Sequence, residues 1–180
     1  MILKFGSKVV YPYQGPCRIG AVVKKVIGGK PTSFYHLALL DGSGGELFIP
    51  VDKISGLGIR QLMARSEIPK LLGLLKKSAV TTTNWKQRAI DNFQLLTSGS
   101  ISDLAEVVES LTELNETRLL SPRDRQTLDR ARRILICEIS EVTGETKAAA
   151  EEEIDRALNV RKRHEANGKK RGSRPVARDQ

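Results

Sequence analysis

The first 54 residues carry the hydrophobic pattern of short β-strands. A Gly-Gly pair, Gly28-Gly29, lies between two β-prone runs, and such a pair is a hairpin signal. Closely spaced strands with glycine-rich turns are typical of a small open barrel or a meander. An edge strand of such a module is a natural place for another protein's strand to add. We therefore expect a β-module over residues 1–54, with strands over 8–12, 17–27, 33–40 and 46–50.

Beyond a hinge-like stretch at 55–58, the apolar residues recur at the three- and four-residue steps of helices. A short helix is predicted over 59–64, and Ser66 is expected to cap the next one. Later helices are expected over 85–97, from 101, over 122–142, and from 146 to about 160, with Ala79–Thr83 as a loop. Their starts carry capping residues, which are Thr83 or Asn84, Ser100 and Ser121. The sequence therefore predicts an α+β chain with a helical module over residues 55–160.

Positive charge is concentrated at the end of the chain. The net charge is +9, and residues 161–180 hold eight Lys and Arg against Glu165 and Asp179, which leaves only +3 for the rest. Gly, Pro, Lys and Arg dominate this segment, so we expect a disordered basic tail. Such a tail suits nucleic acid or another acidic surface, and it can equally serve only to keep the protein soluble.

Signatures of catalysis and of metal binding are missing from the sequence. No phosphate loop, GxSxG or HExxH motif occurs, and no His, Cys, Asp and Glu cluster has zinc-ligand spacing. Cys17 and Cys137 lie far apart in sequence and are expected to be reduced, buried thiols. No apolar run reaches the length of a membrane span, and no secretory leader is evident. We expect a cytoplasmic protein that is no enzyme, with no cofactor, no metal, no membrane contact and no small-molecule substrate.

Two features in the helical half leave alternatives open. Trp85 shares a helical stripe with Ala89, Phe93 and Leu96, and spacing alone favours a place for the indole in the core. Alternatively, the ring lies half-exposed on a basic helix end, where it could stack on a base or wedge beside one. Arg125 and Arg132 share a face of a later helix. The basic cluster to which they belong, with Arg123, Arg130 and Arg133, is either an ordinary solvated face or a patch for the DNA backbone.

Several segments resemble the CarD/CdnL family of bacterial transcription regulators. In the helical half the resemblance rests on Thr83-Asn84-Trp85-Lys86-Gln87-Arg88, on Leu120-Ser121-Pro122-Arg123-Asp124-Arg125, and on residues 96–100, 105–108 and 131–135. In the β-module it rests on residues 6–12, Gly15, Ile49-Pro50 and 58–60. The segments follow one another in the order of the family from about residue 2 to residue 160. The basic tail lies outside the resemblance.

The resemblance implies a division of labour between the two modules. The β-module would be a Tudor-like or SH3-like barrel that binds the β subunit of RNA polymerase, and the helical module would bind promoter DNA. In the family, the Trp matched by Trp85 wedges into the minor groove at the upstream edge of the transcription bubble and stabilises the open complex. Arg88 and Arg125 match positions that hold the DNA backbone, and Lys86 lies beside them. The protein would then be associated with the nucleoid through RNA polymerase.

The resemblance also implies which residues contact the polymerase. Lys25 matches a basic contact position, and Glu46 and Phe48 are assigned to the same contact. Phe48 departs from the family, which often carries a basic residue there, so a more apolar contact is expected. Ala89 stands where the family often has an aromatic residue. A non-catalytic protein–protein adaptor in transcription or repair, with only incidental DNA contact, stays open as the second hypothesis.

Overall fold

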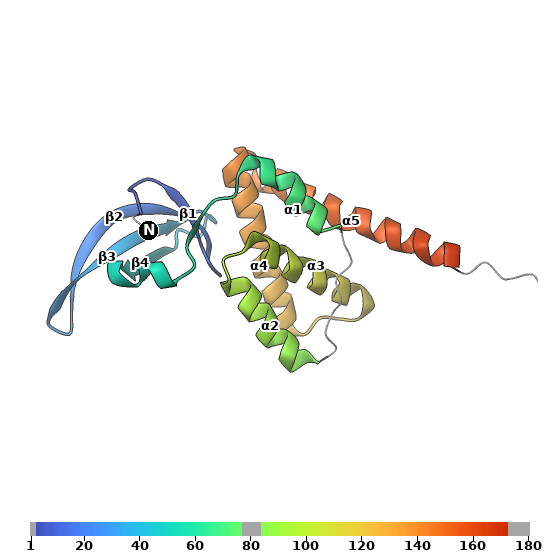
Figure 1. Ribbon diagram of the computed structural model, residues 1–180, viewed down its shortest axis with the longest axis horizontal. Helices are drawn as coiled ribbons and strands as arrows, with labels where there is room; N and C mark the ends of the chain where they lie inside the picture. The colour runs from blue at the N-terminus through green and yellow to red at the C-terminus, as the bar shows by residue number, and fades with distance from the viewer. Residues whose placement is uncertain (1–2, 77–83, 173–180) are drawn as a thin grey trace, which may run out of the picture.

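The computed structural model describes residues 3–76 and 84–172, with side chains given as far as residue 159. An antiparallel five-stranded sheet precedes helices α1–α5, which confirms the α+β class (Figure 1). The strand order is β4-β3-β2-β1-β5. The strands are β1 (Lys8–Tyr11), β2 (Gly15–Ile27), β3 (Lys30–Leu39), β4 (Glu46–Pro50) and β5 (Arg60–Gln61).

The long β2–β3 hairpin forms where the sequence indicated it. Gly28 and Gly29 turn the chain with φ angles of 57° and 78°, which glycine adopts without steric cost. Alternate residues of the strands pack on one face together with Ile54 of the 3₁₀-helix Val51–Gly56, and they form the core of the sheet. Cys17 belongs to this core, and its burial raises the pKa of the thiol to about 12. Cys17 and Cys137 are both free and buried, as predicted.

The helices begin at the capping residues that the sequence offered. Asn84, Ser100 and Ser121 each accept a hydrogen bond from a backbone amide in the first turn of α2, α3 and α4, respectively. Gly144 ends α4 with a φ of 77°. The helices are α1 (Ile68–Leu74), α2 (Trp85–Thr97), α3 (Ile101–Thr117), α4 (Pro122–Thr143) and α5 (Lys147–Gly172). Their apolar faces share a second core centred on α3 and α4.

Three sequence predictions were wrong at the element level. The predicted helix over 59–64 is instead strand β5, because Val9 and Val10 of β1 offer a free edge with which Gln61 and Arg60 pair. Helix α1 starts one residue after Glu67 rather than at Ser66, since Glu67 accepts a hydrogen bond from the Ala64 amide at 2.7 Å and a 3₁₀ turn comes first. Helix α5 continues to Gly172 instead of giving way to disorder near residue 161.

Charged residues with good helix propensity explain the length of α5. Lys, Arg, Glu and Ala tolerate a solvated helix well, so the segment needs no apolar face to continue. The end of the predicted tail, 173–180, and the predicted loop 79–83 lie outside the described residues.

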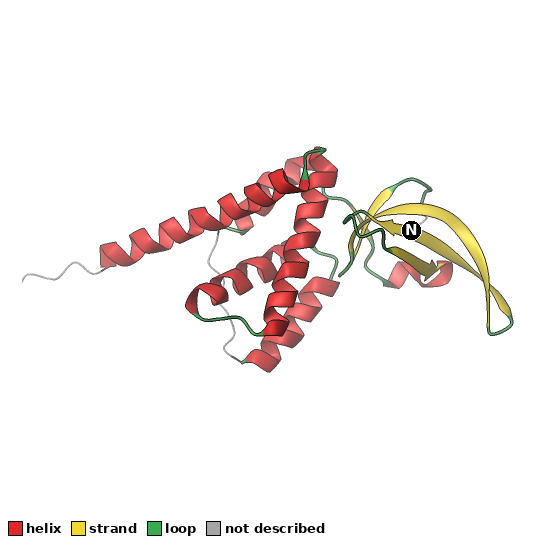
Figure 2. Cartoon of the chain, turned by 180° about the vertical axis from the view of Figure 1, so that it is seen from behind, coloured by secondary structure: helices red, strands yellow, loops and turns green. Residues whose placement is uncertain are grey.

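The sheet and the helices meet along α4, at the narrow junction that Figure 2 shows between the yellow strands and the red helices. Arg60 donates two hydrogen bonds to the fully buried carboxylate of Glu138, at 2.6 and 2.8 Å. The same carboxylate accepts the amide of Met63 at 2.8 Å. Lys8 adds an ion pair with Glu141 at 2.7 Å. These contacts hold the sheet against α4. The segments on both sides of the predicted hinge at 55–58 are therefore attached to the same helix.

Candidate nucleic-acid interface

The indole of Trp85 is exposed at the first residue of α2, with 61% of the residue accessible. The core position that spacing favoured is therefore wrong. The buried stripe of α2 instead consists of Arg88, Asn92 and Leu96. Lys86 lies beside the indole, with its ammonium 5.5 Å from the ring centroid. A large aromatic face is thus presented to solvent at a positive helix end.

Arg88 lies beneath this surface rather than on it. Only 5% of the residue is accessible, and its guanidinium donates to the Asp124 carboxylate at 2.9 and 3.5 Å. Ser121 holds the same carboxylate through its hydroxyl at 2.9 Å. Burial raises the pKa of Asp124, but the hydrogen bonds from Arg88 and Ser121 outweigh burial and lower it overall. The pair ties the first turn of α2 to the first turn of α4, so Arg88 positions the site and does not offer a cation to solvent.

Exposed cations surround the place where these two helices begin. Lys86, Arg123 and Arg125 are exposed, and Arg118 joins them from the end of α3. The first turns of α2 and α4 lie beside each other, joined by Arg88 and Asp124, and helix N-termini favour anions. Arg125 therefore fits a role at the DNA backbone, as does Arg123 of the same predicted cluster. Arg118, which the sequence analysis had not named, lies beside them.

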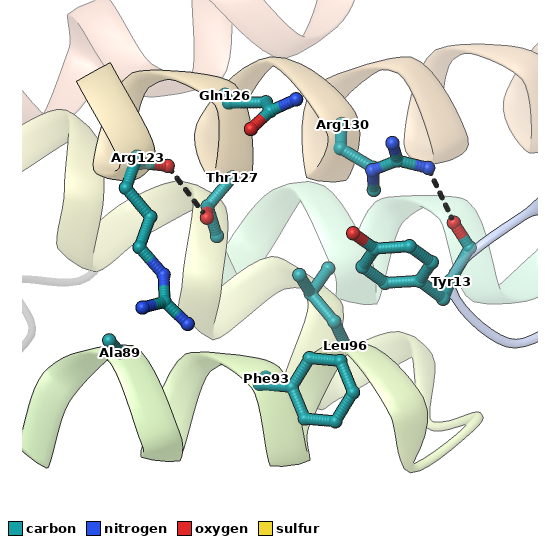
Figure 3. Close-up of a pocket in the computed structure, with 8 residues that line it drawn as sticks. All are labelled: Tyr13, Ala89, Phe93, Leu96, Arg123, Gln126, Thr127 and Arg130. Atoms are coloured by element: carbon teal, nitrogen blue, oxygen red, sulfur yellow. Dashed lines mark hydrogen bonds between the residues drawn. The ribbon is translucent and has the colours of Figure 1, made fainter.

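A small cavity between α2 and α4 links this region to the sheet (Figure 3). Tyr13 enters it from the β1–β2 turn, with its ring 6.0 Å from that of Phe93 and 4.2 Å from the guanidinium carbon of Arg130. Figure 3 shows Arg123 reaching across the other end of the cavity toward Ala89. The turn of the sheet therefore contacts both helices that carry the exposed cations and the indole.

The residues predicted to contact the polymerase gather on the open face of the sheet. The Lys25 ammonium lies 3.5 Å from the centroid of the Phe48 ring, and the His36 ring stacks on the same phenyl group with centroids 5.2 Å apart. Glu46 approaches His36 at 3.3 Å. Phe48 and Glu46 belong to β4, which is an edge strand of the sheet. Lys25, Glu46 and Phe48 thus form one connected cluster at an edge where a further strand can pair.

Other chemistry finds no support in the described residues. No group of three or more His, Cys, Asp or Glu side chains in that part of the chain could hold a metal ion. No described helix is long and apolar enough to cross a membrane. Besides Arg118, sequence reasoning missed Leu119, an exposed leucine between α3 and α4 that lies near Trp85 in the same groove. Its position after a helical apolar pattern gave no signal of exposure.

Comparison with known proteins finds similarity over both halves of the chain. Residues 3–63 match the family described as CarD-like/TRCF RID domain, and residues 70–155 match CarD, C-terminal domain. The "Putative transcription factor YdeB" of Bacillus subtilis (strain 168) is 25% identical over 147 residues, which cover 81% of this chain and 95% of that protein. The solution NMR structure of the 72-residue N-terminal domain of Myxococcus xanthus CarD is 32% identical, covers 33% of this chain and 77% of that one, and has a TM-score of 0.28.

Proposed function

Because this chain belongs to the CarD/CdnL family of transcription regulators, we propose that it binds the β subunit of RNA polymerase and stabilises the open promoter complex. The exposed indole of Trp85 at a cationic helix end is the observation that carries this proposal. The sheet attaches the protein to the polymerase, and the helices contact DNA at the upstream edge of the transcription bubble. The protein itself catalyses no reaction in this scheme.

The indole acts by preferring one state of the DNA. Apolar side chains that insert between adjacent base pairs unstack them and bend the duplex. An exposed aromatic ring also offers a stacking surface to unstacked bases. A ligand that binds the melted junction better than closed duplex shifts the population toward the open complex by that difference in affinity. Stacking on one aromatic ring contributes about 1–3 kcal/mol, which corresponds to a shift of roughly fivefold to hundredfold.

The cations position the protein on the duplex, and the polymerase contact keeps it near the promoter. Phosphate contacts from Lys86, Arg123 and Arg125 position the protein on the duplex without reading its sequence. Attachment to the polymerase raises the effective concentration of the helices near the promoter, so weak intrinsic affinity for DNA suffices. Arg88 contributes indirectly, since its pair with Asp124 holds Trp85 and the start of α4 together.

Paired substitutions in the two halves of the full chain test this scheme. Trp85→Ala should shorten the lifetime of the open complex at least fivefold while capture of the polymerase β subunit stays at the parental level. Phe48→Ala should weaken capture of the polymerase β subunit, because it removes the ring on which Lys25 and His36 pack, while binding of the free protein to DNA stays at the parental level. Open complexes as long-lived with the Trp85 variant as with the parent would refute the wedge. A protein–protein adaptor with incidental DNA contact would show that result.

A further inference from the structure

Leu119 is displayed to solvent by a connection that is anchored on both sides. It is 88% accessible, more than any other large apolar side chain of the described residues. The Arg118 amide before it donates to the carbonyl of Leu114 at 3.0 Å, and Leu120 after it is buried in the helical core. Ser121 then caps α4. Since consecutive side chains of an extended segment point to opposite sides, the burial of Leu120 directs Leu119 outward.

Leu119 and Trp85 line the same groove. The groove lies between the start of α2 and the α3–α4 connection, and its volume of about 530 Å³ is in the range of ligand pockets. Its walls are mainly apolar, with Ala89, Leu120 and Pro122 beside the two exposed residues. Single exposed apolar residues are ordinary on protein surfaces, but here two of the most exposed meet in one groove.

The charges around the groove indicate the chemistry of its occupant. Arg118 and Arg123 also line the groove and are exposed, and the amide groups of two helix N-termini lie nearby. Arg88 and Asp124 line the groove as a buried pair, so its net positive charge comes from the two exposed arginines. Mainly apolar walls beside exposed cations fit a ligand that has a flat apolar face and an anionic group. A nucleotide has both, through its base and its phosphate.

We propose that this groove receives one unpaired base of DNA, which packs against Trp85 and Leu119 while Arg118 and Arg123 meet the flanking phosphates. The inference rests on the proposed function and adds a second contact to it. A base in a closed duplex is stacked and paired, so it cannot enter the groove. Occupancy is thus restricted to the separated strands and adds to the preference of the indole for the open state.

A forked DNA with a single-stranded end tests the groove directly with the full chain. Anisotropy of a labelled fork measures binding of every variant, and emission of Trp85, the only tryptophan, reports contact at this site in the variants that keep it. The parent should bind a fork more tightly when the first unpaired nucleotide carries a base than when that nucleotide is abasic. Leu119→Ala should weaken binding to the fork with the base about threefold to tenfold, through loss of apolar contact. It should leave binding to the abasic fork and to paired duplex unchanged.

Ile90→Ala is the matched control, because Ile90 is 53% accessible on the same helix as Trp85 but does not line the groove. It should behave as the parent does on every DNA. Parental binding of both forks by Leu119→Ala overturns the inference, and the proposed function stands if Trp85→Ala still weakens binding to the fork. Loss of polymerase capture by Leu119→Ala, with fork binding intact, would instead assign the groove to a protein. If Trp85→Ala too leaves fork binding and open complexes unchanged, the proposed function fails as well.

Discussion

Among single residues, the buried Arg88–Asp124 pair shows most clearly how the site is held in place. Both side chains are less than one-tenth accessible, and the carboxylate also accepts from Ser121. A buried ion pair repays the cost of desolvation only when the geometry is good and further hydrogen bonds are made, and both conditions are met here. The pair therefore serves to join two helix ends, and the proposed DNA contacts fall to the exposed cations around it.

Asp124→Asn should lower the free energy of unfolding by about 3 kcal/mol near neutral pH, because it leaves the Arg88 guanidinium buried without its counter-charge. The folded-state pKa of Asp124 lies below its ordinary value of 3.8, so the pair stabilises fully above that value. This stabilisation is lost as pH falls through the folded pKa. The difference between parent and variant should therefore stay constant from about pH 7 to about pH 5 and narrow below about pH 4, in urea unfolding followed by Trp85 emission.

Asp129→Asn provides the comparison, since Asp129 is an exposed carboxylate on the same helix. Its stability should stay within about 0.5 kcal/mol of the parent at every pH. A gap for Asp124→Asn that is small, or that does not narrow below about pH 4, would contradict the role given to the pair.

Helix α2 shows how far the candidate site could be predicted from the sequence. Residue type and resemblance predicted that Trp85 and Arg125 would matter, and both are exposed beside other cations. Periodicity placed Trp85 in the core because it assumed that the buried stripe of α2 is apolar. The buried stripe begins with Arg88 and Asn92, and the partner of Arg88, Asp124 of α4, cannot be read from spacing along α2. The exposure of Leu119 could not be predicted, because it depends on the burial of Leu120 in the helical core.

At the level of elements, a close approach of two turns joins β5 to the α2–α3 connection. A Cβ atom at Gly99 would lie 2.6 Å from the Gly58 carbonyl oxygen, and the φ of Gly99 is +81°. Arg60 also donates to the Gly99 carbonyl. The start of β5 and the end of α2 therefore depend on a backbone contact that only glycine permits at this position.

Gly99→Ala should destabilise the fold by about 2 kcal/mol or more, because it adds left-handed strain to a clash with backbone. Gly73→Ala is the opposite case, since Gly73 lies in α1 and a Cβ there would meet nothing within 4 Å. That variant should be unchanged or more stable by up to about 1 kcal/mol. The midpoints of urea unfolding, compared at an unchanged m-value, measure the stability of both variants. A Gly99→Ala variant as stable as the parent would show that the two turns can separate at little cost in free energy.

Strand β5 illustrates which elements the sequence could predict. Elements marked by local sequence signals, such as turn glycines or N-capping residues, were predicted well. Examples are the Gly-Gly hairpin and the capped helices α2 to α4. The segment around Arg60 has only weak local preference, and its structure is decided by the free edge of β1 and the carboxylate of Glu138. Local pattern therefore predicted the fold class and most helices, whereas the element that connects the two halves required the tertiary structure.

For the whole molecule, the important property is that contacts with α4 connect the sheet edge proposed to bind the polymerase with the helix end proposed to bind DNA. Edge strand β4 carries Phe48, and Trp85 lies at the start of α2 in the helical part. Between them, Arg60 and Lys8 pair with carboxylates of α4, and Tyr13 packs on Phe93. In the proposed function, this arrangement would direct the indole to one place on the promoter once the sheet is bound, which would reduce the entropy lost on binding.

The exposed cations set the salt dependence of DNA binding by the whole chain. If three or four of Lys86, Arg118, Arg123 and Arg125 meet phosphates, log K should fall against log salt with a slope of about −3 to −4. Arg125→Ala should reduce the magnitude of that slope by about 1. Arg133→Ala, an exposed arginine roughly 12 Å further along α4, should leave it unchanged. Removal of residues 161–180 should weaken DNA binding only modestly. A large fall in the magnitude of the slope after that truncation would show that the basic segment, and not the helix N-termini, makes the phosphate contacts.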